Sequence, residues 1–369
     1  MPASTGLRLV DVMAMATRTT VLRRDLHPAC GGGGPALDSS CARSFARSFV
    51  SRFFWLGLAA VVPSGLAATP AGAQFLDVTP SASGPTLGDV RTQKLRVGVV
   101  VTAEGGPCRG IYATMPVPAD WPEQKVKVVS EDLSPDVRAL RYRTLPGGLK
   151  QMIVEIPDLP SGEKAHAIVT FSLDRAAIVA PANTVSLSIP AKPDRSLRTY
   201  LGASPFIETR HPKIVKLAKA TGEGLDGWQK VEAIYDTVRE KVEYRNGDLK
   251  GAARALADGW GDCEELTCLF IAMARVEGIP ARTVWVEGHC YPEFYLVDAE
   301  GTGWWLPCQA AGARAFGGMP DQLPILQKGD SFRDPDRPAQ TLRYVSEFIR
   351  GAAVDGGGSP KVSWIREAG

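Results

Sequence analysis

The chain has 369 residues, of which 44% are apolar and 22% are charged. This is the composition of an ordinary globular protein with room for two domains. The net charge of +2 comes from the first 52 residues, which contain seven arginines and three aspartates. The remainder is close to neutral, which excludes the basic surface that a nucleic-acid partner requires.

The front of the chain has the pattern of a targeting segment. Residues 1–52 are predicted to be disordered or an extended basic n-region, and residues 53–73 a signal peptide. Its apolar stretch, Phe53 to Ala68, is shorter than the roughly 20 residues that span a bilayer. Ala71-Gly72-Ala73 then provides a cleavage site. We expect export to the periplasm or outside the cell, with no stable membrane span after cleavage; an uncleaved anchor is the alternative.

Export implies an oxidising compartment, in which cysteines commonly form disulfides. Five cysteines follow the predicted cleavage site, and an odd number leaves at least one thiol unpaired. They are Cys108, Cys263, Cys268, Cys290 and Cys308.

Residues 85–195 are predicted to form a β-sandwich. The alternation of Leu95, Val97, Val99 and Val101 is that of a half-buried strand. Further short apolar runs follow at regular spacing, separated by turns such as Pro146-Gly147-Gly148, which is typical of a sandwich.

Residues 200–350 change to a helical pattern followed by strands. A short helix is expected from Pro212 to Ala220, followed by a longer one whose apolar stripe begins at Trp228. Strands are expected at about 282–287, 289–297, 304–309 and 342–348. Residues 351–369, with three successive glycines, are expected to be a flexible tail.

A third helix is predicted to begin at Cys263. Asp262 is a suitable N-cap, and Glu265 stands three residues later, as in a capping box. Gly278 and Pro280 mark the end of this helix.

Cys263 is therefore a thiol in the first turn of a helix, where the helix dipole and free N–H groups favour thiolate. Asp262, Glu264 and Glu265 oppose this, because nearby negative charge raises a thiol pKa. Activation would then need a cationic imidazole. His289, on the second strand after the helix, can approach Cys263 in a helix-on-sheet fold. The alternative is a buried structural cysteine.

Several motifs at matching spacing resemble the transglutaminase-like superfamily. They are Gly261-Asp262-Cys263, the run Gly278 to Arg282, His289 with Glu293, and Trp305-Leu306-Pro307. The resemblance implies an α+β fold: a papain-like core of helices on an antiparallel sheet, here after an N-terminal β-sandwich. It also implies a Cys-His-Asp triad and no cofactor.

Carried over by residue, the resemblance makes Cys263 the nucleophile and His289 the base. The orienting Asp is replaced by Gln309, and Asp298 in the following turn is the second choice. An amide can fix the imidazole tautomer but stabilises the imidazolium less than a carboxylate does. Trp260 is a candidate for oxyanion stabilisation or, more simply, for a wall of the substrate site.

Strand pairing suggests a further feature. If His289 pairs with Gln309 across the hairpin, then Cys290 pairs with Cys308 on the other face. A disulfide between these two cysteines is possible at that spacing. The alternative is a pair of small buried thiols.

The sequence thus predicts a thiol enzyme that acts on a protein or peptide substrate through a Cys263 thioester, by hydrolysis or by transfer to an amine. The alternative is an inactive or weak envelope binding module on the same fold, which the Gln309 replacement favours. The spacing of the cysteines and His289 fits no closed zinc site. Nothing in the sequence indicates an oligomeric state.

Overall fold

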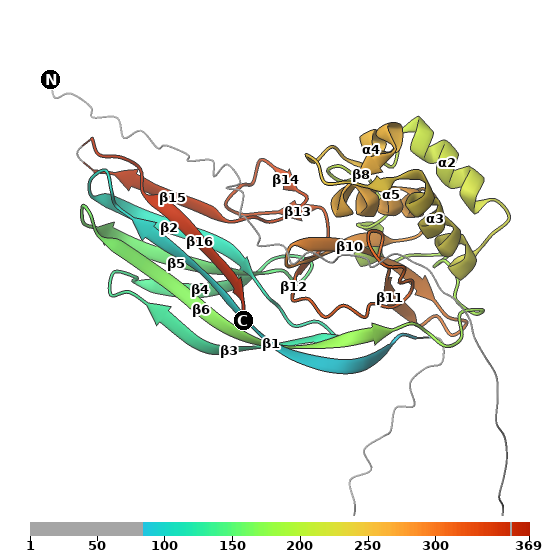
Figure 1. Cartoon of the computed structure of the whole chain (residues 1–369), viewed down its shortest axis with the longest axis horizontal. Coiled ribbons are helices and arrows are strands. Elements are labelled where there is room, and N and C mark those ends of the chain that lie inside the picture. The colour runs from blue at the N-terminus through green and yellow to red at the C-terminus, as the bar shows by residue number, and fades with distance from the viewer. Residues whose placement is uncertain (1–83, 355) are drawn as a thin grey trace, which may run out of the picture. The chain divides into compact units, whose positions relative to one another are not determined.

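Figure 1 shows the computed structural model of the protein, which describes residues 84–354 and 356–369. The predicted n-region (1–52) and signal peptide (53–73) lie outside the described residues. Within those residues, no helix is both long and apolar enough to cross a membrane.

The first and last strands of the described chain form a sandwich of two antiparallel four-stranded sheets (Figure 1); the predicted β-sandwich is therefore present, with two added C-terminal strands. One sheet has the order β16-β1-β6-β3 and the other β15-β2-β5-β4. The strands are β1 (Thr86–Thr102), β2 (Cys108–Val117), β3 (Gln124–Leu133), β4 (Ala139–Thr144), β5 (Lys150–Leu159), β6 (Lys164–Val179), β15 (Phe348–Ala353) and β16 (Lys361–Ala368).

Alternation builds the sandwich core. In β1, Leu95, Val97, Val99 and Val101 are fully buried, while Arg96 between them is exposed. The inward side chains of β2, β5 and β6 complete the same apolar cluster. One face of each sheet is therefore apolar, and the two faces close on each other.

The end of the chain is not the flexible tail that we expected for residues 351–369. Strand β16 pairs with β1 over eight residues, from Leu95↔Ala368 to Thr102↔Lys361. Val362 and Trp364 alternate along it and pack on the sandwich core. The three glycines suggested a loose end, but they form only the connection between β15 and β16. The expected strand over 342–348 is likewise two short pieces, β14 (Thr341–Leu342) and the start of β15.

In sequence, the helices and a third four-stranded antiparallel sheet, here called the core sheet, lie between β6 and β15 of the sandwich. The sheet has the order β11-β10-β9-β12. Its strands are β9 (Ala281–Val286), β10 (His289–Val297), β11 (Gly303–Pro307) and β12 (Ile325–Lys328). The helices are α1 (Arg195–Arg198), α2 (Pro212–Gly222), α3 (Gly227–Lys241), α4 (Ala252–Asp258) and α5 (Cys263–Val276), with short strands β7 (Glu243–Tyr244), β8 (Trp260–Gly261) and β13 (Phe332–Arg333).

Helix α5 is the centre of this layer. All its residues from Glu265 to Arg275 are buried, because α2, α3 and α4 cover it on the sides that the sheet does not. The predicted stop is a Schellman motif: Gly278 has a φ of +78°, and the Ile279 N–H donates to the Ala274 carbonyl at 3.0 Å. Such a fixed helix can hold a reactive group at its first residue with little freedom.

A buried ionic network connects the core sheet (β11-β10-β9-β12) to the sandwich. Lys328 on β12 is 3% exposed, and its Nζ lies 2.6 Å from both Glu123 and Glu293. Arg282 on β9 completes the network with an ion pair to Glu293 at 2.9 Å. The network contains two carboxylates and two cations, and this pairing of opposite charges offsets the cost of burying them.

Candidate active site

Cys263 is the first residue of α5, at the end of a tightly built turn. The Asp262 side chain accepts from the Glu264 N–H at 2.8 Å, and Glu265 accepts from the Asp262 N–H at 3.0 Å. The predicted capping box is therefore present. Gly261 is required by packing, because a Cβ there would lie 2.5 Å from the Glu265 Cβ.

His289 opens β10 beside this turn. Its Nε2 lies 2.9 Å from the Gln309 Oε1, and the Cys263 thiol lies close enough to raise the pKa of the ring. Since Nε2 faces Gln309, Nδ1 is the ring nitrogen left for the sulfur. The structure thus brings the three predicted residues Cys263, His289 and Gln309 together at one place.

The hairpin register behind this series differs from the predicted one. The predicted pairing of His289 with Gln309 would place Trp305 opposite Glu293, but Pro307 is there, a shift of two residues. A shift of two keeps each side chain on its face, so His289 and Gln309 meet diagonally. The same shift separates Cys290 from Cys308, and both are free thiols. The predicted disulfide is therefore wrong for this structure.

Gln309 is held rigidly. Its backbone carbonyl accepts from the Tyr235 hydroxyl at 2.9 Å and from the Arg239 guanidinium at 3.0 Å. Its side-chain Nε2 donates to the Asp321 carboxylate at 3.3 Å. The Oε1 atom is thereby fixed toward His289, because the amide nitrogen is committed to Asp321.

Asp321 is the residue that the sequence reasoning missed. It lies on the irregular segment before β12, far from any motif, and no local pattern marks it. The second-choice acid, Asp298, is elsewhere: its Oδ1 accepts from the Glu300 and Thr302 N–H groups and closes the turn at the far end of β10.

The charges around Cys263 favour its thiolate. The hydrogen bond from Cys290 is the largest cause that lowers the thiol pKa; burial opposes it, and His289 adds to the lowering, so that the pKa is about 4. Burial alone would lower the pKa of His289, but Cys263, Gln309 and the Asp321 charge raise it above its usual value. A thiolate–imidazolium pair is the consequence.

The acidic neighbours oppose this pair less than the sequence suggested. Burial raises the pKa of Glu264 to about 7, although its ion pair with Arg343 acts in the opposite direction. Burial and a hydrogen bond to Glu265 raise the pKa of Asp262 to about 7 as well. Both carboxyls are therefore partly protonated near neutral pH, which weakens their repulsion of the thiolate.

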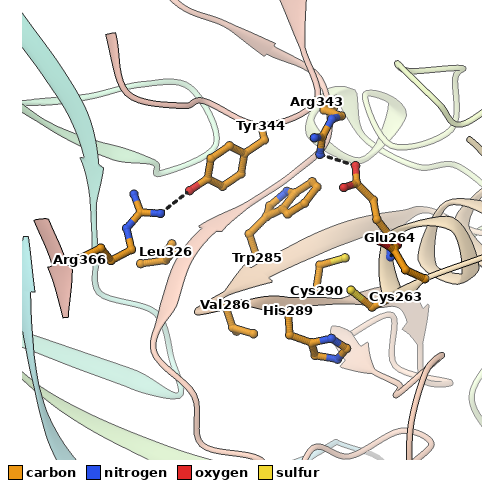
Figure 2. A pocket seen from close by; sticks show the side chains of 12 residues that line it. Cys263, Glu264, Trp285, Val286, His289, Cys290, Leu326, Arg343, Tyr344 and Arg366 are labelled. Carbon is orange, nitrogen blue, oxygen red and sulfur yellow. Dashed lines mark hydrogen bonds and ion pairs between the residues drawn. The ribbon is translucent and has the colours of Figure 1, made fainter. Parts of the chain in front are cut away.

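A pocket of about 330 Å³ opens beside the thiol (Figure 2). Cys263, His289 and Cys290 line one side of it, and the side chains of Trp285 and Leu326 also line it. The opposite wall comes from the C-terminal part of the chain, including β16, and consists of Arg343, Tyr344 and Arg366. The last residues thus complete the site as well as the sandwich.

Trp260 does not line this pocket. Its ring lies against Gly247, and the Lys250 ammonium sits 3.0 Å from the ring centroid. This places the side chain on the loop before α4, where it packs beneath a lysine. We therefore draw no oxyanion or substrate-wall role from its position.

A partly buried thiol at a helix start, an imidazole on the adjacent sheet and an amide behind it are arranged as in a papain-like fold. Comparison with known proteins agrees. Residues 215–310 match the model of the transglutaminase-like superfamily, the same resemblance that the motifs indicated.

Two solved structures are similar to the chain. One, from Cytophaga hutchinsonii, is described as a "Putative Cysteine Protease"; it has a TM-score of 0.50 and 17% identity, covering 76% of this chain and 92% of that one. The other, a "putative protease" from Parabacteroides distasonis, has a TM-score of 0.22 and 12% identity, covering 61% of this chain and 72% of that one. The first shows a shared fold. No curated protein matches the sequence.

Proposed function

We propose that this protein is a cysteine-nucleophile enzyme that cleaves peptide or amide bonds through a thioester on Cys263. The observation that carries the proposal is the placement of Cys263, His289 and Gln309 together at the edge of an open pocket. Nucleophile, base and orienting group are the three roles that acyl transfer to a thiol requires.

In the first half of the reaction, the Cys263 thiolate attacks the substrate carbonyl. The negative charge that develops on oxygen is stabilised by the Cys263 backbone N–H, which has no acceptor within the first turn of α5. The imidazolium of His289 then donates its proton to the leaving amine. Gln309 keeps the ring oriented through both transfers.

In the second half, His289 takes a proton from the acceptor as it attacks the thioester. Water gives hydrolysis, and a second amine gives transfer. We favour hydrolysis with a peptide or protein substrate, because the pocket wall opposite the thiol is polar. Arg343 and Arg366 there are suited to hydrated groups, whereas selective transfer needs a site that excludes water.

We also propose that the protein acts after export. Support comes from the sequence alone: the basic n-region, the apolar segment within 53–73 and the Ala-Gly-Ala site. Mass spectrometry of the protein recovered from the periplasm or the medium, starting at Gln74, tests this. Recovery of the uncleaved chain in the cytoplasm contradicts it.

Thiol labelling tests the central proposal without knowledge of the substrate. Iodoacetamide at limiting concentration is expected to label Cys263 first, and much faster than Cys268 in the buried middle of the same helix. Cys263→Ala removes the label, and His289→Ala slows it. Slow labelling spread over several cysteines, or labelling unaffected by His289→Ala, contradicts the proposal.

The second candidate function is a binding module with a degenerate site, which Gln309 in the position of the family's Asp favours. A Gln309→Asp variant separates the two. A large gain of peptidase activity from an undetectable baseline supports degeneration. Measurable activity in the natural protein, changed little or lowered by the substitution, supports an enzyme adapted to an amide at this position.

A further inference from the structure

A second thiol lies against the proposed nucleophile. Cys290, directly after His289 on β10, is only 2% exposed, yet it lines the same pocket as Cys263. Figure 2 shows the two sulfur atoms pointing toward each other, and the nearby Cys263 raises the pKa of the Cys290 thiol. Neither the proposed acyl chemistry nor the sandwich fold requires a cysteine at this position.

The packing holds Cys290 in this direction. Its Sγ lies 3.9 Å from the Oγ1 of Thr267, one helical turn after Cys263 on the same face of α5. The other cysteines are turned elsewhere: Cys268 and Cys308 are buried within the apolar cluster of the helical layer. Among the described residues, Cys290 is thus the thiol placed to react with Cys263.

We propose that Cys263 and Cys290 form a peroxide-responsive dithiol, in which Cys290 captures the oxidised nucleophile as a reversible disulfide. The inference rests on the proposed function in one respect, the reactivity of Cys263 as a thiolate. A solvent-accessible thiolate beside a second thiol is the arrangement by which proteins sense oxidants and return to the reduced state, and Cys263 is partly exposed and lines the open pocket.

The chemistry balances in two steps. The Cys263 thiolate attacks a hydroperoxide; an S–O bond forms, the O–O bond breaks, and the leaving alkoxide or hydroxide takes up a proton from the His289 imidazolium. The Cys290 sulfur then attacks the sulfenic sulfur; an S–S bond forms, the S–O bond breaks, and the Cys290 proton leaves with the oxygen as water. Two thiols and one hydroperoxide give one disulfide, one alcohol or water, and one water.

Two consequences follow. The disulfide removes the nucleophile and ties the start of α5 to β10, so the enzyme is switched off while oxidant persists. It also stops Cys263 short of sulfinic acid, which thiols do not reduce. A reductant restores the site, which suits an enzyme acting in an oxidising compartment.

The test uses the natural protein, reduced and then treated with one equivalent of hydrogen peroxide. Peptide mapping is expected to show a Cys263–Cys290 cross-link with the loss of two hydrogens. Iodoacetamide labelling of Cys263 is lost and returns with dithiothreitol. In Cys290→Ser, which keeps a hydroxyl donor toward Cys263, the same treatment gives no cross-link, and excess peroxide adds two oxygens irreversibly to Cys263. Cys268→Ala is the matched control and still forms the cross-link.

The outcomes separate the two proposals. If Cys263 labels rapidly in the reduced protein but peroxide adds oxygen without a cross-link, or joins a different pair, the dithiol is wrong and the enzyme proposal stands. If Cys263 is unreactive toward both reagents in the reduced natural protein, both proposals fail. The peptide map of the natural protein decides the question even where a variant does not fold.

Discussion

Removing the charge of Asp321 is the sharpest test of how the site works. The Asp321→Asn variant keeps an oxygen that can accept from the Gln309 amide at the observed 3.3 Å, but removes the carboxylate's negative charge. Because that charge helps to raise the pKa of His289, its loss should lower this pKa. The imidazolium that protonates the leaving amine would then be lost at a lower pH.

The size of the effect follows from distance and exposure. Along the series of hydrogen bonds, the carboxylate lies at most about 8 Å from the imidazole, where unit charges interact by roughly 2 kcal/mol at an effective dielectric constant of about 20 and roughly 0.5 kcal/mol in water. Asp321 is exposed, so the lower end applies. We expect the pKa of His289 to fall by roughly half a unit.

Histidine NMR measures this directly, because the sequence has only four histidines and His289→Ala assigns the signal. Asp298→Asn is the matched control: it also removes one carboxylate charge, but in a turn at the far end of β10. The shift from Asp321→Asn should shrink in high salt, which screens an exposed charge. An unchanged His289 pKa in Asp321→Asn, or an equal shift in Asp298→Asn, refutes the reasoning.

Two further predictions concern stability. Lys328→Met leaves the Glu123 and Glu293 carboxylates buried without their shared cation, and urea unfolding should show a loss of about 3–5 kcal/mol. Lys361→Met breaks only an exposed ion pair and should cost less than about 1 kcal/mol; equal losses would contradict the burial argument. The Asp262→Asn variant tests whether protonation of Asp262 contributes to the pH dependence of folding stability. Because the folded pKa of Asp262 is raised from 3.8 to about 7, the native state holds its proton more tightly, and wild-type stability falls as pH rises through that window. We therefore compare the melting temperature of the variant minus that of the wild type at two pH values. This difference should be more positive at pH 8 than at pH 4. An equal difference at both pH values would count against the raised pKa of Asp262.

The parts of the site that the sequence predicted are those specified by local signals. The cap of Asp262, the Schellman stop at Gly278 and the alternation along β10 each depend on residues within a few positions of one another. Local rules therefore placed Cys263 at a helix start and put His289 and Gln309 on one face of the sheet. Helix α4, short and rich in alanine, gave too weak a periodicity to be recognised.

The parts that the sequence did not predict depend on long-range pairing. A shift of two residues in the hairpin register leaves the alternation pattern unchanged, so the pattern could not reveal it. Arg366 enters the pocket wall only because β16 returns to pair with β1. The alternation of Val362 and Trp364 was the available signal for that strand, and the neighbouring glycines concealed it.

With Gln309 in place of the expected Asp, the orienting role and the negative charge of that Asp belong to two different residues, Gln309 and Asp321. In the mechanism that we propose, the amide, fixed by Tyr235 and by Asp321, takes the orienting role of the Asp in the transglutaminase-like pattern. The negative charge is one hydrogen bond farther away, where solvent weakens it. Stabilisation of the thiolate instead depends first on Cys290. A site organised in this way tolerates a neutral third member, but its nucleophile becomes dependent on a neighbouring thiol and therefore sensitive to oxidants.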